Sequence, residues 1–348
     1  MHRDNHYVPR SYLKRWSSDG KRVWVYRVLV PHESVPTWRR TSTRGIAYHE
    51  HLYTRVAASG ESDELERWLD AEFEAPAEDA IGRAVANKSL SRHDWRLLVR
   101  FFAAQDVRTP ARLLENLKRW SSWLPDLMQR TVTDSVAKLE TMSPSERATL
   151  TANALPGDGL PFRVTTERRP GETGGWLKGE TIAGRGLWLW SMRHLLSGEP
   201  LEALCKHRWT ILAPPDGQTW FTSDDPVLKL NFNGVEDYNF GGGWGSVGTD
   251  LFLPLSPYHM LYTQIGRPVP TRGARLDSER AALVRRFIAE RAHRYVFASS
   301  PDQTVPLLRP RTVDAAELRR EQAEWARWHN DQSTAERELM GWQKCAAT

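Results

Sequence analysis

The chain has 348 residues and a formal net charge of +5, a length that allows a sizeable hydrophobic core in one large domain or two. Apolar residues make up 40% and charged residues 26% of it, a composition that excludes disorder throughout the chain. The two cysteines are far apart, so we expect neither structural disulfides nor a thiolate zinc site. The first residues lack the apolar core of a secretory signal, and no apolar run of about 18 residues occurs. We therefore expect a cytoplasmic protein without a membrane span.

The first part of the chain is predicted to be a short β element followed by helices. Runs of β-branched and aromatic residues predict the strands, and apolar residues at helical spacing predict the helices. Ser91 and Thr109 each precede a helical pattern and are predicted N-caps, whereas Pro76 lies inside one, so a kink or a new helix start is expected there. The predicted elements are strands at 22–30 and 45–53 and helices at 62–85, 91–103 and 109–142, with a further N-cap at Ser143.

The second part is predicted to be rich in antiparallel strands. Residues 155–180 are rich in Gly and Pro and show little periodicity apart from residues 161–165, which indicates a loop-rich connection. After it, turn-type residues separate most of the apolar runs, and this spacing favours antiparallel pairing. The predicted elements are helices at 186–196, 201–206, 277–290 and 314–342 and strands at 208–212, 219–222, 227–230, 251–255, 260–265 and 295–298.

These patterns predict an α+β fold with a small N-terminal β element, a helical middle and an antiparallel β-rich second half closed by helices. Residues 1–150 would contain an N-terminal arm, short strands and a helical bundle, and residues 151–348 the β-rich part with the C-terminal helices. We expect the two parts to form one integrated domain. No pattern in the sequence indicates the oligomeric state.

Charge is divided unevenly along the first quarter of the chain. Residues 1–50 carry ten Lys or Arg against four Asp or Glu, whereas residues 51–90 carry four against nine. The basic region also contains Trp16, Trp24 and Trp38, and basic residues with interleaved aromatic rings are typical of single-stranded nucleic-acid binding. Nucleic acid is therefore a possible partner. Alternatively, the two regions neutralise each other within the fold.

The opening residues, Asn5-His6-Tyr7-Val8-Pro9-Arg10-Ser11-Tyr12-Leu13, concentrate special residue types at a terminus, where polar and dispensable residues are usual. Pro9 restricts the residue before it to an extended conformation, and an extended segment alternates its side chains. His6 would then face the interior with its imidazole available as base or ligand. Tyr7, Arg10 and Tyr12 are candidate substrate-binding residues; alternatively, the whole segment only fixes the terminus.

A second candidate is the turn Ser223-Asp224-Asp225-Pro226 at the end of a predicted strand. Two adjacent carboxylates can bind a divalent cation or act as acid and base, and Ser223 adds a hydroxyl as a substrate contact. The same residues also form turns that side chains cap without any chemistry.

Two residues of the helical part, Glu74 and Arg108, are weaker candidates. Glu74 ends an amphipathic stretch, and Arg108 lies at a helix junction where its guanidinium could bind a phosphate or carboxylate or pair with a nearby acid. The pair His49-x-His51 would place two imidazoles on one face of a strand, a weak signal for a metal.

In chain order, five segments resemble the bacterial family catalogued as domain of unknown function 4238. They are residues 5–16, the acidic helix ending near Glu74, residues 105–110, residues 221–227 and residues 253–257. The family usually has Asn where this chain has Asp225. The resemblance implies membership of a family without an assigned activity.

The leading hypothesis from the sequence is a metal-dependent hydrolase acting on nucleic acid or another phosphate ester. His6, Glu74, Arg108 and Asp224 would be catalytic, and His6, Asp224 and Asp225 would bind a divalent metal ion. One alternative is a non-catalytic nucleic-acid or protein binding module in a toxin or phage-defence context. Another is a metal-dependent oxidative tailoring enzyme with His6, His49 and His51 as ligands.

Overall fold

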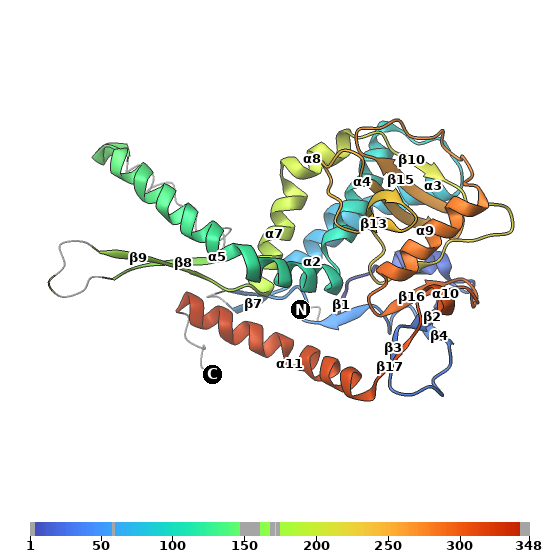
Figure 1. Cartoon of the computed structure of the whole chain (residues 1–348), viewed down its shortest axis with the longest axis horizontal. Coiled ribbons are helices and arrows are strands. Elements are labelled where there is room, and N and C mark those ends of the chain that lie inside the picture. The colour runs from blue at the N-terminus through green and yellow to red at the C-terminus, as the bar shows by residue number, and fades with distance from the viewer. Residues whose placement is uncertain (1–3, 58–59, 147–160, 168–170, 172–174, 342–348) are drawn as a thin grey trace.

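The computed structural model describes residues 4–57, 60–146, 161–167, 171 and 175–341. The fold is α+β, as predicted, with a helical middle and antiparallel sheets in the second half. In Figure 1 a long C-terminal helix lies along one side of the body, and a second long helix projects away from it together with a hairpin.

Two sheets of more than two strands form the centre of the β part, beside four two-stranded pairs, within the described residues. The larger has the order β10-β15-β14-β12-β13, and its strands are Thr210–Leu212, His259–Gln264, Asp250–Ser256, Leu228–Gly234 and Asp237–Asn239. The other has the order β11-β16-β2-β4, and its strands are Thr222–Ser223, Tyr295–Ala298, Arg22–Arg27 and Trp38–Ser42. Val25 pairs with Phe297 in this second sheet. One sheet therefore joins strands from residues 1–150 to strands from residues 151–348.

The helical middle begins with three consecutive segments, α2 (Glu64–Leu69), the π-helical turn η2 (Asp70–Glu74) and α3 (Ala75–Val85). Pro76 lies in the first turn of α3, where its missing N–H leaves no hydrogen bond unmade, so it marks a new helix start. α4 (Arg92–Val107) opens with the predicted cap, because Ser91 and Asp94 exchange side-chain and backbone hydrogen bonds in a capping box. Thr109 caps α5 (Pro110–Thr141).

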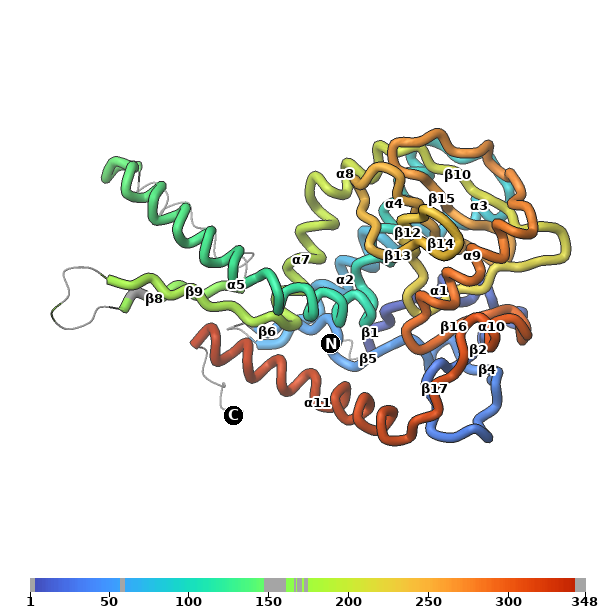
Figure 2. Tube along the Cα trace, viewed as in Figure 1, coloured from blue at the N-terminus to red at the C-terminus, as the bar shows by residue number. Residues whose placement is uncertain are grey.

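α5 and the hairpin β8–β9 project together from the body (Figure 1, Figure 2). The hairpin strands are Phe162–Glu167 and Trp176–Thr181, so the region predicted as a loop-rich connection contains paired strands. The periodic residues 161–165 overlap the first strand, but the second strand has no such signal, because much of the hairpin is exposed and apolar alternation is weak there. Ser143, a predicted N-cap, exchanges hydrogen bonds with Glu146, and residues 147–160 lie outside the described part of the chain.

The N-terminal segments and the C-terminal helix lie against one another. β1 (Asp4–His6) pairs with β5 (Tyr48–Glu50), followed by the hairpin β6–β7 (Arg55–Ala57 and Gly60–Ser62). α1 (Arg10–Leu13) and a 3-10 turn (Lys14–Trp16) follow β1. Near the other end, β17 (Thr312–Val313) pairs in parallel with β3 (Leu29–Val30) and leads into α11 (Ala315–Met340), which begins at the cap Asp314.

The remaining helices among the described residues are α7 (Arg185–Ser197), α8 (Glu199–Lys206), α9 (Ser278–Arg291) and α10 (Val305–Leu308). The largest apolar cluster joins the N-terminal segments to the helical middle, and a second cluster lies between α9 and the sheets. Among the helices described, none combines the length and the apolar character needed to cross a membrane.

Candidate functional site

Buried hydrogen bonds fix the N-terminal arm, residues 5–16, inside the body. The Tyr12 hydroxyl lies 2.7 Å from both the carbonyl oxygen of Pro254 and the hydroxyl of Thr222. The Trp16 indole donates to the carbonyl of Trp220 at 3.0 Å. Tyr12, a candidate substrate contact, is fully buried and makes these contacts within the fold, and buried Trp16 offers no surface for stacking bases.

Tyr7, and not His6, is the residue of the arm that faces the interior near Asp224. In the β1–β5 pair Asn5 lies opposite His49, so Asn5 and Tyr7 share the inward side and His6 the outward side. The His6 Nε2 contacts the carbonyl oxygen of Arg44 at 3.2 Å. Burial, and then the charge of Asp224, raise the pKa of Tyr7.

Two other arm residues lie away from that interior. Burial is the main cause that lowers the pKa of His6, and the charges acting on it belong to Arg10, Arg108 and Asp4. Arg10 is exposed at the first residue of α1. Arg10 therefore remains available to a partner, whereas the His6 imidazole is directed towards the Arg44 backbone.

Arg108 is fully buried and surrounded by partners from three segments. It forms an ion pair with Glu74 at the end of the π-helical turn, donates to the carbonyl oxygen of His6 at 2.6 Å and lies 3.3 Å from the Tyr53 hydroxyl. Burial alone would lower the pKa of Arg108, but Glu74 and Tyr53 raise it above its usual value. The structure thus brings Glu74, Arg108 and the backbone of His6 together. The guanidinium already binds these protein groups, so it is not free to bind a substrate.

The turn after β11 directs its carboxylates to two different places. Asp224 accepts backbone hydrogen bonds from His293 and Arg294, both at 2.8 Å. Asp225 accepts from the Thr109 hydroxyl at 2.9 Å and pairs with Arg291 at 2.6 Å. Ser223 caps the turn, because its hydroxyl donates to the Asp225 carbonyl and accepts from the Asp225 N–H. The groups proposed as metal ligands, His6, Asp224 and Asp225, therefore face separate partners.

Beneath α11, four residues that we call the inner cluster lie near one another: Tyr7, His49, His293 and Asp224. The His49 ring is stacked between Tyr7, at 5.5 Å between centroids, and Trp325 of α11, at 3.9 Å. Burial and the nearby His293 lower the pKa of His49 to about 4. Burial also lowers the pKa of His293 to about 4, and its buried Nε2 has no hydrogen-bond partner among the described residues.

Asp224 is the acidic member of the inner cluster. Burial raises the pKa of Asp224 to about 7, against the opposing effect of the backbone N–H groups of Arg294 and His293. Both imidazoles are therefore neutral near pH 7, beside a carboxyl group that titrates there. Such a pairing of titratable groups is typical of acid–base sites and also occurs in structural networks.

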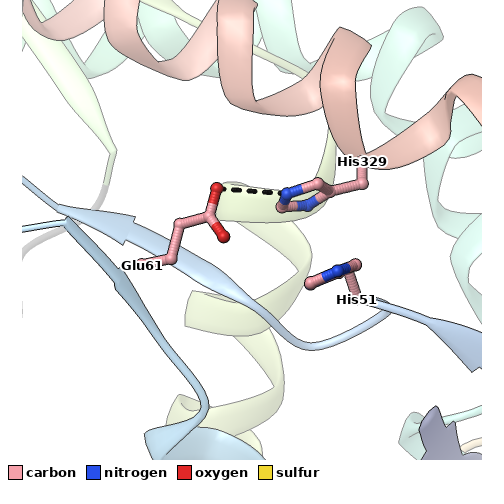
Figure 3. Close-up of side chains that lie close together, drawn as sticks. All are labelled: His51, Glu61 and His329. Atoms are coloured by element: carbon pink, nitrogen blue, oxygen red, sulfur yellow. Dashed lines mark hydrogen bonds and ion pairs between the residues drawn. The ribbon is translucent and has the colours of Figure 1, made fainter. Parts of the chain in front are cut away.

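Next to the inner cluster lies a second group, the outer cluster, consisting of His51, Glu61 and His329 (Figure 3). One ligand atom from each of the three lies within 4.8 Å of the others, and within the described part of the chain this is the one set of three such residues that meets this condition. His329 Nε2 lies 3.1 Å from Glu61 Oε1, and the two imidazole rings stack with centroids 4.0 Å apart. Two imidazoles and a carboxylate are a common ligand set for divalent metals.

A guanidinium determines which His329 nitrogen carries the proton. Arg185 approaches His329 Nδ1 at 2.9 Å, and because a guanidinium can only donate, Nδ1 must accept. Nε2 therefore carries the hydrogen that is donated to Glu61. On the other ring, His51 Nδ1 lies 3.1 Å from the Thr54 hydroxyl.

The sequence contained part of the outer cluster. His51 belongs to the His49-x-His51 signal, and both rings do face α11, but His49 stacks on Trp325 and His51 on His329. Trp325 and His329 are four residues apart on one face of α11, a spacing that could have indicated a shared surface. Glu61 and His329 are separated by most of the chain, and no local pattern connects them.

The matching family model, described as a protein of unknown function (DUF4238), covers residues 4–302. The chain belongs to this family. The comparison with curated proteins and the comparison with solved structures each returned no match. α11, and with it His329 and Trp325, lies beyond the matched residues.

Proposed function

We propose that this DUF4238 protein is a divalent-metal-dependent hydrolase of phosphate esters, with nucleic acid as the substrate class. The observation that carries the proposal is the outer cluster, in which two imidazoles and one carboxylate from β7, α11 and the segment after β5 converge within 4.8 Å. A bound divalent ion would polarise a phosphate oxygen and lower the pKa of a bound water.

The inner cluster would supply acid–base groups beside that metal. His49 and His51 are two residues apart, and their stacking partners Trp325 and His329 are one helical turn apart, so the two clusters are neighbours along α11. Neutral His49 and His293 can accept a proton from an attacking water, and Asp224 can exchange one near pH 7.

Among the arginines near the inner cluster, Arg291 pairs with Asp225 and Arg294 with Glu321, which leaves Arg309 as the one considered for an anionic substrate. The charges of Arg294, Arg291 and Arg309 are close enough to His293 to lower its pKa, after the larger effect of burial. The buried Nε of Arg309 finds no hydrogen-bond acceptor within the described ranges. We assign Arg309, in place of Arg108, as the candidate phosphate contact.

Titration of the metal-free protein with Zn²⁺, Mn²⁺ and Co²⁺ tests the proposal directly. We expect one site per chain, and His51→Gln, Glu61→Gln and His329→Gln should each weaken binding by at least about 100-fold. His32→Gln, which changes an exposed histidine, is the matched control. Hydrolysis of single-stranded RNA and DNA should need the metal and be lost in the same three variants. Binding that is unchanged in all three would refute this metal site.

The non-catalytic alternative has one observation in its favour: Arg108, Asp225, Ser223 and Tyr12 all serve as internal contacts. Nucleic-acid binding without metal and without turnover in the same assays would select it. The oxidative alternative uses a related ligand set, since two histidines and one carboxylate also bind Fe(II). The set first considered for it, His6, His49 and His51, has three different ring partners. Anaerobic Fe²⁺ titration with O₂ consumption as readout distinguishes it from hydrolysis.

A further inference from the structure

The β2–β4 pair carries basic side chains that the fold leaves without acidic partners. Residues 17–44, which contain both strands, have six Lys or Arg against two Asp or Glu. One of these cations, Arg40, pairs with Asp19 at 2.9 Å. Within the part of the chain that the structure describes, four exposed cations of this segment form no ion pair: Lys21, Arg22, Arg39 and Arg44. The acidic residues 51–90 therefore do not neutralise them.

Trp24 lies among these cations. It is directly opposite Arg40 in the β2–β4 pair, and Arg22, two residues before it, is on the same side of the sheet. The Trp24 ring is partly exposed and belongs to neither apolar cluster, and among the described residues it has no hydrogen-bond or aromatic partner. Trp38, by contrast, donates to the carbonyl oxygen of Asp302 at 3.2 Å. Trp24 therefore keeps a ring that a ligand can cover.

We call Trp24 and the cations around it the basic surface; its residues are Lys21, Arg22, Trp24, Arg39, Arg40 and Arg44. Cations around a partly exposed ring match the chemistry of a single-stranded nucleic acid. Lys and Arg bind its phosphates, and an aromatic ring stacks on an unpaired base. A membrane or an apolar protein partner would need protruding apolar side chains, and no large apolar side chain of residues 17–44 is strongly exposed.

The basic surface is separated from the inner cluster by the sheet. Trp24 lies opposite Ala298 of β16. Tyr295, whose charge acts on Tyr7 of the inner cluster, is three residues before Ala298 on the same strand and so faces the other side. β4 is the edge of this sheet, so a strand bound at Trp24 would pass around β4 to reach the inner cluster. Binding at the basic surface should therefore need no metal.

We infer that the basic surface binds single-stranded nucleic acid, with Trp24 stacking on a base and Arg22 and Arg40 contacting phosphates on either side of it. This inference rests on the proposed function for the substrate class alone. It adds to that function a surface that holds a long substrate away from the two clusters.

Fluorescence anisotropy tests the surface with a labelled single-stranded oligo(U) RNA of about 12 nucleotides and the metal-free full-length protein. We expect Trp24→Ala to weaken binding about tenfold and Arg22→Gln about fivefold. Arg22→Gln should also lower the slope of log affinity against log salt by about 0.7, because one phosphate contact is lost. The matched controls are Trp123→Ala and Arg130→Gln, at exposed residues of α5, which projects from the other end of the body (Figure 1).

Three results would overturn the basic surface. The first is equal RNA affinity of Trp24→Ala, Arg22→Gln and the two controls. The second is binding to phosphatidylserine vesicles, but not to RNA, that depends on Trp24. The third is competition by polyglutamate as strong as by unlabelled RNA, which would indicate an acidic protein as the partner. If Trp24→Ala does not fold, the affinity and salt slope of Arg22→Gln decide, because that side chain is exposed.

The Zn²⁺ titration judges the hydrolase separately. RNA binding that depends on Trp24 in a protein that neither binds Zn²⁺ nor hydrolyses RNA would support the basic surface and refute the hydrolase. Zn²⁺ binding that depends on His51, Glu61 and His329, without RNA binding, would refute the basic surface and restrict the hydrolase to small phosphate esters.

Discussion

At the scale of single residues, Arg108 shows how a side chain that resembles a substrate contact can serve the fold instead. Its position before Thr109-Pro110 suggested an anion-binding fork, and the fork is present, but Glu74, Tyr53 and the His6 carbonyl fill it. Sequence identifies the residue type and the helix junction. Burial decides whether the charge faces a substrate or the protein, and burial depends on segments distant in sequence.

Replacing Arg108 should therefore affect stability. Arg108→Gln leaves Glu74 without its buried partner and should lower the free energy of unfolding by about 3–5 kcal/mol. Arg108→Lys keeps the charge but loses the fork, so its effect should be smaller. Urea unfolding measures both, with Arg40→Gln at an exposed ion pair as the control that stays close to the native value. If Arg108→Gln abolished hydrolysis at native stability, Arg108 would have to be a functional residue.

At the scale of elements, the helix caps predicted from local patterns at Ser91 and Thr109 are confirmed. The capping box at Ser91 and the cap at Thr109 are where the sequence indicates, because a cap involves only three or four consecutive residues. The π-helical turn Asp70–Glu74 has no such signature, although it is the turn that ends at Glu74 beside Arg108. The outer cluster also has no local signature, because its three residues come from segments far apart in the sequence.

The arm offers a test of how one side chain connects separate elements. Tyr12→Phe removes a hydroxyl that contacts Pro254 of one sheet and Thr222 of the other. The buried Pro254 carbonyl and Thr222 hydroxyl would lose this hydrogen-bond partner, and we expect a loss of about 1–3 kcal/mol in the free energy of unfolding. Zn²⁺ affinity should not change, because Tyr12 lies outside both clusters. Tyr258→Phe, at a side chain that is 59% exposed, is the control. Weaker substrate binding at native stability would instead support the role first considered for Tyr12.

At the scale of the whole molecule, the α+β class and most elements follow from composition and periodicity, whereas the arrangement does not. The alternation of the arm is a local property, yet whether His6 or Tyr7 faces inward is set by pairing with β5. The boundary predicted at residue 150 is placed where the sequence changes from helical to strand patterns. The β2–β16 pair, however, joins residues on both sides of that boundary. Long-range pairing is the information that a single sequence lacks.

Stability against acid should depend on His293. The pKa of His293 is lowered from 6.5 to about 4, so the folded state favours the neutral ring. The free energy of unfolding is therefore unaffected by the ionisation of this residue above pH 6.5 and decreases as the pH falls from 6.5 towards 4. The loss attributable to this residue is about 3 kcal/mol. Urea unfolding between pH 7.5 and 4 should therefore show a smaller decline in His293→Gln than in the native protein. Asp224 changes the free energy of unfolding in the opposite direction over this pH range, because its pKa is raised to about 7. This effect occurs in both proteins, so the difference between them largely cancels it. Parallel declines would exclude a buried neutral His293.

The strand order β11-β16-β2-β4 has a consequence for synthesis. β2 and β4 leave the ribosome early, but the strand that completes their sheet, Tyr295–Ala298, is translated near the other end of the chain. Until then β2 has one unpaired edge, which invites pairing with other nascent chains. We expect the protein to depend on chaperones that shield such an edge, and fragments that end before Tyr295 to aggregate even though they include most of the apolar core.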